Sequence, residues 1–502
     1  MDIWTAVLPI LAIGLFFYFL KRKNLFEQLE IPHDSSVPIL GNMGPCLLGK
    51  MNVIELIQSL YDRHADAKYF GLYDFQTPII VIRDPEIIKS IAIKNFENFP
   101  DHRGFTDSDR DPLFGKSLFS LKGDDWREMR AILSPSFTSS KMKMMFHLIT
   151  ECAVNFTNVV LERSKNEDYE ANIKDIFTRI TADVISSCAF GININSMKEP
   201  KNELYVMGRE STDFEGILSL KFLLIRNFKF ISRLLGVKIV SDSVTRFFTN
   251  VISSNIATRR EKGITRPDFL QLMMEAQNKN SLSRELTIQE ITANAFIFFF
   301  GGLDTVSTQL CYIAHEITVN PHVQNRLQKE IDSVLANCNG EPSYNDIINM
   351  SYMDAVINET MRLHPGGFLL DRVCKNKFEL PPPLPGKEPI TLDAGTNIWI
   401  PVLSIQRDPK YYESPEKFDP ERFLGDNKIN MNATTFIPFG IGPRICIGNR
   451  FALMEMKIAL FHLLSRFNFK VCLKTPIPLK YKKNTFALLP EGGFWLKFEL
   501  RK

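Results

Sequence analysis

Residues 439–448, with the sequence FGIGPRICIG, constrain the structure and chemistry of this 502-residue chain more than any other segment. The loop places Cys446 just before residues 449–467, a run with helical character. The free N–H groups at a helix N-terminus favour a thiolate over a thiol, so Cys446 is placed to be an anionic sulfur. Arg444 adds a fixed cation that suits a carboxylate. A soft anionic ligand beside a carboxylate-binding arginine describes a site for haem.

The glycines of this loop favour the same interpretation. Gly440, Gly442 and Gly448 carry no side chain where the backbone has to approach a flat partner closely. The alternative is a buried structural cysteine in a turn, which is the commoner role of a lone cysteine. Ten positions with this composition rarely coincide by chance, which favours the haem site.

The loop resembles the haem-binding loop of the cytochrome P450 family, F-x-x-G-x-R-x-C-x-G, with every defining position present. The resemblance implies haem b with an axial thiolate from Cys446, in a loop that includes Phe439, Gly440 and Arg444. It also implies one large, mainly α-helical domain with a small β-rich lobe near the N-terminus and the haem between them.

Composition sets limits on other functions. A hydrophobic fraction of 45% is ample for a large buried core, and a net charge of +3 is too small to indicate nucleic-acid binding. None of the eight cysteines has C-x-x-C spacing, so the sequence predicts no zinc site or redox dithiol. Scattered cysteines in a chain of this size do not predict a disulfide framework either, and we expect them reduced.

The N-terminus carries a targeting signal. Residues 3–20 are uncharged and strongly apolar, and Lys21, Arg22 and Lys23 follow them. This length just spans a hydrocarbon core of about 30 Å, and the basic cluster behind it predicts a cytosolic remainder. A cleaved signal peptide is the competing interpretation, but the charge follows the apolar run and no small-x-small cleavage site is present. We therefore predict an anchor in the endoplasmic reticulum membrane over residues 1–23, a proline- and glycine-containing hinge over 24–50 and a catalytic domain over 51–502.

Residues 216–240 combine long apolar side chains with lysine and arginine and contain no acid. A basic amphipathic segment of this kind can lie in a membrane surface. The alternative is a solvated helix face packed on the core. In the cytochrome P450 family the matching region lies between the F and G helices and often touches the bilayer, which favours membrane contact.

A capping box at residues 287–290 predicts a long helix that reaches residue 319. Two glycines at 301 and 302, followed by Asp304 and Thr305, weaken its middle. If Thr305 or a water diverts a backbone hydrogen bond, a small polar pocket opens there. The alternative is a buried helix with a close-packing glycine pair.

This segment resembles the family's central helix motif, [AG]-G-x-[DE]-T. By that resemblance Asp304 and Thr305 are the catalytic pair that passes protons during oxygen activation. Many members carry a second hydroxyl residue next, whereas this chain has Val306, which would alter proton delivery.

Glu359 and Arg362 lie three residues apart, on one helix face, and Arg422 follows in the segment PERF. In the family such an E-x-x-R pair is buried and joined by the later arginine. The resemblance implies a structural charge triad that supports the cysteine loop rather than reacting.

Trp126 and Arg130, four residues apart, share a helix face. By resemblance they bind the haem propionates together with Arg444 and Arg372, the latter in the first strand after the E-x-x-R helix.

Substrate contacts follow from the resemblance by segment only: residues 101–119, the helix near 300, the turn 366–370 and residues 485–488. The candidates for the cavity lining are Phe105, Phe114, Phe119, Phe300, Phe368, Leu370 and Phe486. For each of them the alternative is an ordinary place in the core.

The ordered motifs imply a monooxygenase that uses NADPH electrons from a flavoprotein reductase, with cytochrome b5 as a further candidate partner. Residues 266–270, RPDFL, are typical of the animal microsomal clan, and the chain resembles insect members that oxidise xenobiotics. Insecticides or plant toxins are the expected substrates, with endogenous lipids or hormones as the alternative. Arg127, Lys141 and Lys457 are candidates for docking the reductase, or ordinary solvated charges.

Two other functions remain open at this level. A haem-thiolate isomerase or dehydratase acts on peroxides without a reductase, and a haem-binding carrier or sensor has no turnover. The Asp304–Thr305 pair argues against the first, because such family members tend to lose it. A carrier or sensor would not need a proton relay, and NADPH consumption in the presence of reductase would exclude it.

Overall fold

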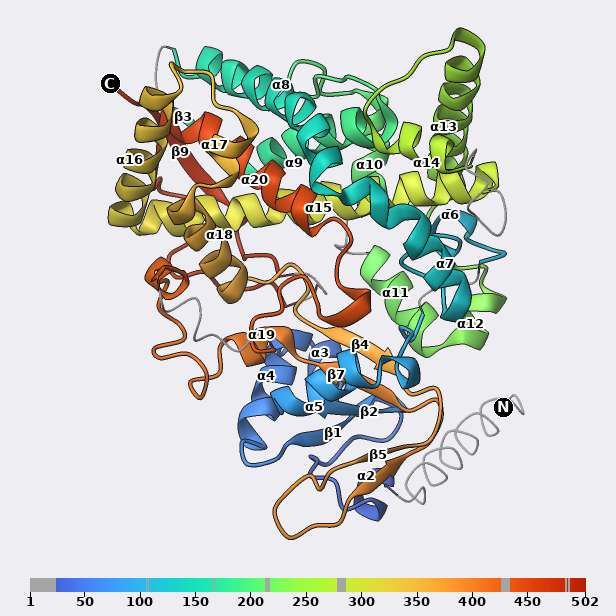
Figure 1. Cartoon of the computed structure of the whole chain (residues 1–502). Coiled ribbons are helices and arrows are strands. Elements are labelled where there is room, and N and C mark those ends of the chain that lie inside the picture. The colour runs from blue at the N-terminus through green and yellow to red at the C-terminus, as the bar shows by residue number, and fades with distance from the viewer. Residues whose placement is uncertain are drawn as a thin grey trace, which may run out of the picture.

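The computed structural model describes residues 24–104, 106, 108–165, 168–212, 217–277, 286–425, 434–483, 485 and 488–502 (Figure 1). A large helical half lies against a smaller lobe that holds the main β-sheet, and each half has its own hydrophobic core. The predicted anchor, residues 1–23, lies outside the described residues.

The helical half is built around one long central helix, α15 (Figure 1). Its helices are α6 (Pro112–Gly115), α7 (Gly123–Leu133), α8 (Ser139–Arg163), α9 (Ile173–Ile185), α10 (Glu203–Thr212), α11 (Ile217–Asn227), α12 (Lys229–Leu234), α13 (Asp242–Lys262), α14 (Phe269–Gln277), α15 (Ile288–Val319), α16 (Pro321–Asn337), α17 (Tyr344–Ile348), α18 (Ser351–Leu363) and α20 (Asn449–Leu464). Short turns of helix are η3 (Ser134–Phe137), η4 (Ser186–Phe190), η5 (Pro420–Phe423) and η7 (Gly442–Arg444).

The predicted capping box starts α15. The Thr287 hydroxyl accepts the N–H of Glu290, and the Glu290 carboxylate accepts the N–H of Thr287 at 2.9 Å. These two bonds satisfy N–H groups that a helix start leaves without partners. The helix ends just before Pro321, which begins α16. The predicted bounds of this helix are therefore confirmed.

The smaller lobe holds a four-stranded sheet in the order β1 (Tyr69–Asp74), β2 (Thr77–Ile82), β7 (Asn397–Ile400), β4 (Leu370–Val373). Only β2 and β7 pair in parallel. The lobe also contains α2 (Leu25–Gln28), α3 (Gly44–Leu47), α4 (Val53–Arg63), α5 (Pro85–Lys89), η1 (Ser90–Lys94), η2 (Phe96–Asn98), α19 (Val402–Gln406) and the hairpin β5 (Phe378–Leu380) with β6 (Ile390–Leu392). Half of the main sheet thus comes from late in the chain, so the lobe is not built from the N-terminal region alone.

One sequence-based expectation needs correction at the boundary of an element. The helix after Cys446 ends at Leu464, and Phe467 begins a strand, β8 (Phe467–Lys470). This strand pairs with β9 (Trp495–Leu500), which also pairs with β3 (Tyr169–Asn172). The start of the predicted hinge, residues 24–50, packs against β1 of the main sheet. Phe26 is buried there, and a Cβ at Gly71 would lie 2.4 Å from its ring.

Among the described residues, two helices are long and apolar enough to cross a membrane by length and composition, α8 and α15. Most of α15 is buried inside the protein, and α8 packs against α9 and α20. Their apolar character is therefore explained by the core that they form.

Candidate functional site

The cysteine loop folds tightly against the start of α20. The Cys446 N–H donates to Phe439 O at 2.9 Å, and the Ile445 N–H donates to Gly442 O at 3.0 Å. Gly440 and Gly442 have φ of +84° and +74°, values that glycine adopts without strain. This turn presents the Cys446 side chain at an accessible surface.

The Cys446 thiol is accessible, yet protein atoms surround it closely. Desolvation raises its pKa above the ordinary value, while the Gly448 N–H and the Arg130 charge oppose that rise. The helix start and the Arg130 charge thus act against the effect of burial on this sulfur. Coordination to a metal ion would make it a thiolate, since a bound thiol is deprotonated outright.

Gly442 has a packing role that the sequence did not indicate. A Cβ at this position would lie 1.9 Å from Ala92 O in η1. Its lack of a side chain therefore allows the loop to pack against η1, and the expected approach to a flat partner is not needed to explain it.

Arg444 and Trp126 lie in direct contact. The Arg444 guanidinium is 3.9 Å from the centre of the Trp126 ring, and its Nη2 lies 3.0 Å from Asp101 Oδ1. Burial and the neighbouring charge of Arg372 lower the pKa of Arg444 to about 10, although Asp101 opposes the shift. Two predicted propionate ligands, Arg444 and Arg372, thus lie near each other.

Two of the arginines at this site have N–H groups that could donate further hydrogen bonds. Arg372 is 1% exposed, donates from Nη1 to Asp371 O at 2.7 Å and has no hydrogen-bond partner for Nε in the described part of the chain. The half-buried Arg130 guanidinium likewise makes no hydrogen bond or ion pair that involves a described residue. Buried donors without acceptors are costly, and carboxylates would satisfy them. The donor set of one sulfur and several convergent cations therefore fits haem and its two propionates.

The middle of α15 carries the predicted acid and hydroxyl. Thr305 Oγ1 donates to Gly301 O at 2.6 Å, so its hydroxyl competes for a backbone acceptor within the helix. Val306 is buried.

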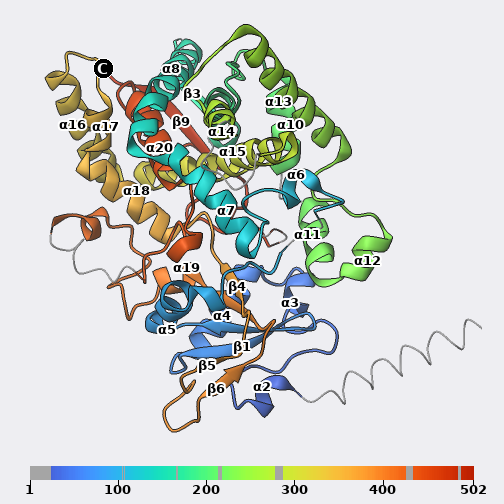
Figure 2. The same ribbon diagram turned by 45° about the vertical axis from the view of Figure 1, so that its right-hand side comes forward.

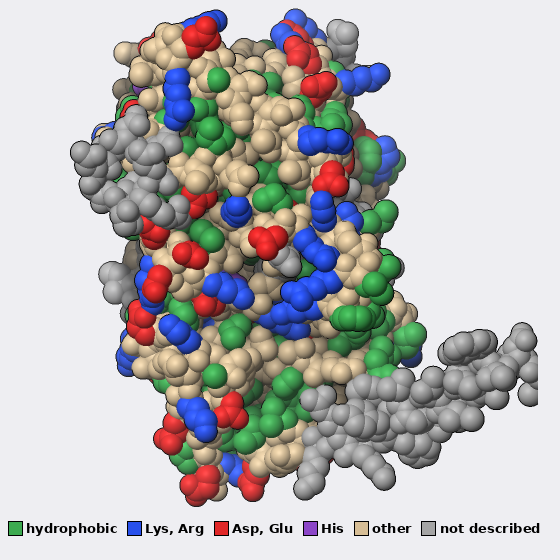
Figure 3. Space-filling view, turned by 90° about the vertical axis from the view of Figure 1, so that its right-hand side faces the viewer, with side chains coloured by type: hydrophobic (Ala, Val, Ile, Leu, Met, Phe, Trp, Pro, Cys, Tyr) green, Lys and Arg blue, Asp and Glu red, His purple; other side chains and the backbone are tan. Residues whose placement is uncertain are grey.

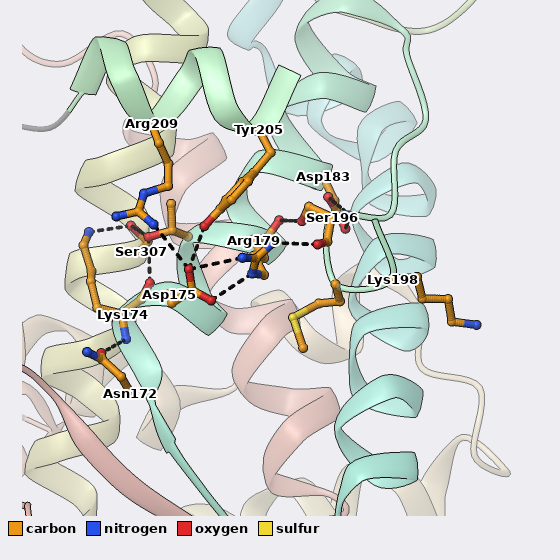
Figure 4. Close-up of polar contacts among 12 residues, drawn as sticks. Asn172, Lys174, Asp175, Arg179, Asp183, Ser196, Lys198, Tyr205, Arg209 and Ser307 are labelled. Atoms are coloured by element: carbon orange, nitrogen blue, oxygen red, sulfur yellow. Dashed lines mark hydrogen bonds and ion pairs between the residues drawn. The ribbon is translucent and has the colours of Figure 1, made fainter. Parts of the chain in front are cut away.

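Asp304 has an ion partner that the sequence did not reveal. Its Oδ1 lies 2.7 Å from Lys174 Nζ of α9, and the same ammonium donates to Ser307 Oγ at 2.8 Å and Thr308 Oγ1 at 2.6 Å. Figure 4 shows Lys174 and Ser307 facing each other. The capping Asn172 accepts the Lys174 N–H at 3.1 Å, which holds the start of α9 in place. No local pattern signals this contact, because α9 and α15 are far apart in sequence.

The next residue on α9 anchors a separate network. Asp175 accepts hydrogen bonds from Arg179 and from Tyr205 of α10 at 2.8 Å each, and Arg209 of α10 lies 3.4 Å away (Figure 4). This network connects α10 to α9 next to the position of Lys174.

A cavity of about 380 Å³ lies beside this part of α15. Its lining includes Phe300, Asp304, Thr305 and Phe368, as predicted or implied, and also Phe75, Phe222, Leu223, Tyr312, Trp399, Leu488 and Leu489. Most of the wall is apolar. Phe222 and Leu223 belong to α11, whose sequence signal was the basic amphipathic pattern of residues 216–240.

The other substrate candidates are placed differently. Phe114 is buried, with its ring centre 5.4 Å from that of Phe300, and does not line the cavity. Phe119 is 44% exposed, and Leu370 lies in β4 outside the lining. Phe105 and Phe486 lie outside the described residues.

The structure brings together the three residues of the expected charge triad. Arg362 donates to Glu359 through Nε at 2.7 Å and Nη2 at 2.8 Å, and both side chains are fully buried. Arg422 Nε lies 3.4 Å from Glu359 Oε1. The Asp419 N–H also donates to Glu359, so the triad connects α18 to the segment that precedes the cysteine loop.

One candidate for reductase docking is wrong. The Lys457 side chain is 3% exposed, and its Nζ lies 2.8 Å from Asp354 Oδ1. It therefore connects α20 to α18 and is not available at the surface. Arg127 is paired with Asp124 and Glu97, and Lys141 is only partly buried.

Comparisons with known proteins cover nearly the whole chain. The family model described as Cytochrome P450 matches residues 32–498. Cytochrome P450 9e2 of Blattella germanica is 43% identical over 99% of this chain and 98% of that protein. Probable cytochrome P450 9f2 of Drosophila melanogaster is 37% identical over 98% of both chains, and cytochrome P450 6k1 of Blattella germanica is 33% identical over 98% of this chain and 96% of that protein.

Proposed function

Because the chain belongs to the cytochrome P450 family of haem-thiolate monooxygenases, we propose that it oxidises lipophilic small molecules with NADPH electrons delivered by a flavoprotein reductase. Foreign compounds such as insecticides or plant toxins are the proposed substrates, and endogenous lipids or hormones are the alternative. The observation that carries this proposal is the largely apolar cavity of about 380 Å³ beside Asp304 and Thr305.

The residues that would hold haem are Cys446, which would bind the iron, and Trp126, Arg130, Arg372 and Arg444, which would hold the propionates. When bound, the haem supplies the oxygen-activating chemistry, with electron donation from the axial thiolate. The protein supplies orientation, charge and exclusion of water.

Asp304 and Thr305 are the proposed proton-transfer pair. Thr305 Oγ1 can exchange its hydrogen bond to Gly301 O for one to a group in the cavity, because both Thr305 and Gly301 line it. Asp304 also lines the cavity, and its carboxylate is held by Lys174 on the α9 side. A general acid has to lie within hydrogen-bond reach of its target or of one bridging water. This intact pair supports a monooxygenase over a peroxide isomerase or a haem carrier.

The buried triad of Glu359, Arg362 and Arg422 has a structural role in this proposal. It holds α18 against η5, ahead of the cysteine loop. None of the three residues lines the cavity, so we assign them no part in the reaction.

We place the enzyme at the endoplasmic reticulum membrane, with residues 1–23 as its anchor, residues 24–50 as the following segment and residues 51–502 as a cytosolic catalytic domain. Exposed apolar side chains on α11 and α12 support membrane contact, and Figure 2 shows both helices at the rim of the molecule. Phe230 is 80% exposed and Leu234 75% exposed. Such residues lower the free energy of a protein at a bilayer surface.

The reduced, carbon-monoxide-bound difference spectrum of the full chain tests the haem site, with Cys446→Ser and the control Cys472→Ser measured beside it. We expect a Soret band at the thiolate position in the wild type and the control only. A band that survives in Cys446→Ser would contradict the assignment. NADPH consumption with reductase, and product formation from a panel of lipophiles, then tests the monooxygenase and its substrates.

A further inference from the structure

We propose that a cationic pocket beside α12 binds the phosphate of an anionic phospholipid headgroup. The pocket has a volume of about 140 Å³ and lies between α12, the end of α11 and the loop that carries Arg103 and Arg110. It is separate from the large cavity, with which it shares no lining residue. The inference rests on the membrane contact proposed above and adds a specific lipid class to it.

Basic side chains from three parts of the chain converge on this pocket: Arg103, Arg110, Lys122, Lys229 and Arg233. The one acid in the lining, Asp111, already accepts the N–H groups of Ile239 and Val240 at 3.0 Å each. Arg103 is paired at 2.8 Å with Asp74, which lies outside the lining. Among the described residues, positive charge therefore predominates at the pocket.

Two of these lysines have capacity for a ligand. The side-chain ammonium groups of Lys122 and Lys229 make no hydrogen bond or ion pair with a residue that the structure describes. Lys122 Nζ instead lies against Gly104, where a Cβ would be only 3.2 Å away. Burial lowers the pKa of Lys229, and the charges of Lys122, Arg103 and Arg233 lower it further. A bound anion would offset this repulsion, and ammonium groups bind phosphate through charge-assisted hydrogen bonds.

The side chains around the pocket indicate which kind of anion it binds. Figure 3 shows basic side chains gathered on this face, with hydrophobic side chains beside them. The exposed apolar side chains of α11 and α12 are Ile217, Leu220, Phe230, Ile231, Leu234 and Leu235. A small soluble phosphate would make no contact with these apolar side chains. A phospholipid would place its headgroup in the pocket and its acyl chains along α12.

The position of α11 connects this pocket to the substrate cavity. Ile225 of α11 lines the cationic pocket, and Phe222 and Leu223 of the same helix line the cavity. A lipid held at the outer side of α11 would therefore also restrain the wall of the substrate site.

The test uses the full-length holoenzyme in phosphatidylcholine vesicles that contain a small amount of spin-labelled phosphatidylglycerol or spin-labelled phosphatidylcholine. The motionally restricted part of the electron paramagnetic resonance spectrum gives the preference for the anionic lipid. The variant is Lys122→Ala with Lys229→Ala, and the control is Lys198→Ala with Lys201→Ala, two exposed lysines outside the pocket.

We expect the wild type and the control to prefer phosphatidylglycerol over phosphatidylcholine. In the pocket variant this preference should be about fivefold lower than in the wild type. An unchanged preference in the pocket variant would overturn the proposal, because the selectivity would then arise elsewhere. Inorganic phosphate is added in a parallel titration. If the wild type binds millimolar phosphate without vesicles and shows no preference for phosphatidylglycerol in vesicles, the pocket is a site for free anions and the lipid assignment is wrong.

The carbon-monoxide difference spectrum of each variant separates this result from the haem assignment. If the pocket variant keeps the thiolate band but loses the lipid preference, the lipid site is supported whatever the substrate of the enzyme is. A wild type that shows the thiolate band and no lipid preference leaves the monooxygenase intact and overturns the lipid site alone.

Discussion

Lys174 Nζ lies 2.7 Å from Asp304 Oδ1 and thereby joins the first turn of α9 to the middle of α15. The ammonium is also held by the hydroxyls of Ser307 and Thr308, so its position is well defined. Asp304 lines the substrate cavity, whereas Lys174 does not. The ion pair therefore fixes the position of the Asp304 carboxylate on the α9 side of α15.

Replacing Lys174 with methionine should reduce the coupling of NADPH consumption to product. The Asp304 carboxylate would lose a charge-assisted hydrogen bond, which contributes about 1.5–3 kcal/mol, so we expect roughly a tenfold decrease in product formed per NADPH. Lys174→Arg keeps the charge and should recover most of the coupling. The measurement is the ratio of product to NADPH, together with the thermal midpoint of each variant.

Asp175→Asn is the matched control for that experiment. It disturbs the neighbouring network between α9 and α10 without touching Asp304. If Asp175→Asn lowers the coupling as much as Lys174→Met does, the effect comes from the packing of α9 and not from the ion pair.

Arg362→Ala should be strongly destabilising. It would leave the fully buried Glu359 carboxylate without its bidentate partner, and breaking such a pair costs about 3–5 kcal/mol. Arg422→Ala removes a longer contact from a side chain that is 14% exposed, so we expect it to cost about 1–2 kcal/mol. Urea unfolding of both variants measures the difference. Equal losses would show that the three residues act as one unit.

Glu455→Gln should flatten the dependence of stability on pH. Glu455 is 1% exposed, neither carboxylate oxygen has a hydrogen-bond partner in the described part of the chain, and burial raises its pKa well above the usual range. In the unfolded chain the group ionises near its ordinary pKa of about 4.3. Above that pH the unfolded chain binds fewer protons than the native protein, so stability falls as pH rises toward the native pKa.

Above about pH 5 the wild type should therefore lose up to about 1.4 kcal/mol per pH unit through this group until the native pKa is reached, and Glu455→Gln should not. Unfolding free energies across that range provide the measurement, with the exposed Glu413→Gln as control. A variant as pH-dependent as the wild type would show that Glu455 does not titrate in this window.

Arg372→Leu should lower haem content without a matching loss of fold stability. The substitution removes a buried guanidinium whose Nε has no partner in the described part of the chain, so the polypeptide itself loses little. We expect the ratio of haem to protein to fall several-fold while the far-ultraviolet circular dichroism is unchanged. Full haem occupancy in the variant would remove Arg372 from the propionate site.

Phe222→Ala should change substrate size preference. Phe222 lines the cavity from α11, so its truncation enlarges the space and removes an aromatic contact. A small lipophile should bind about five- to tenfold more weakly, since roughly 1 kcal/mol of apolar contact is lost, whereas bulkier lipophiles should bind more tightly. Substrate-induced shifts of the Soret band measure the affinities. Phe230→Ala, on the exposed side of α12, should leave them unchanged.

The parts of this protein that the sequence predicted correctly depend on short-range patterns. The Thr287–Glu290 capping box, the turn before Cys446 and the shared helix face of Glu359 and Arg362 all involve residues a few positions apart. Helix periodicity and capping are properties of such local segments, so they can be recognised without knowing how the chain folds. The ordered motifs also sufficed to indicate the family and its haem.

Tertiary structure alone decided which distant segments meet. The pairing of Lys174 with Asp304, the burial of Lys457 against Asp354 and the place of α11 in the cavity wall each depend on how helices pack. The late strands β4 and β7 likewise complete a sheet that β1 and β2 begin. Local patterns do not encode these contacts, because any amphipathic helix can bury its apolar face against many partners. The choice among them is made by the shape complementarity of the whole core.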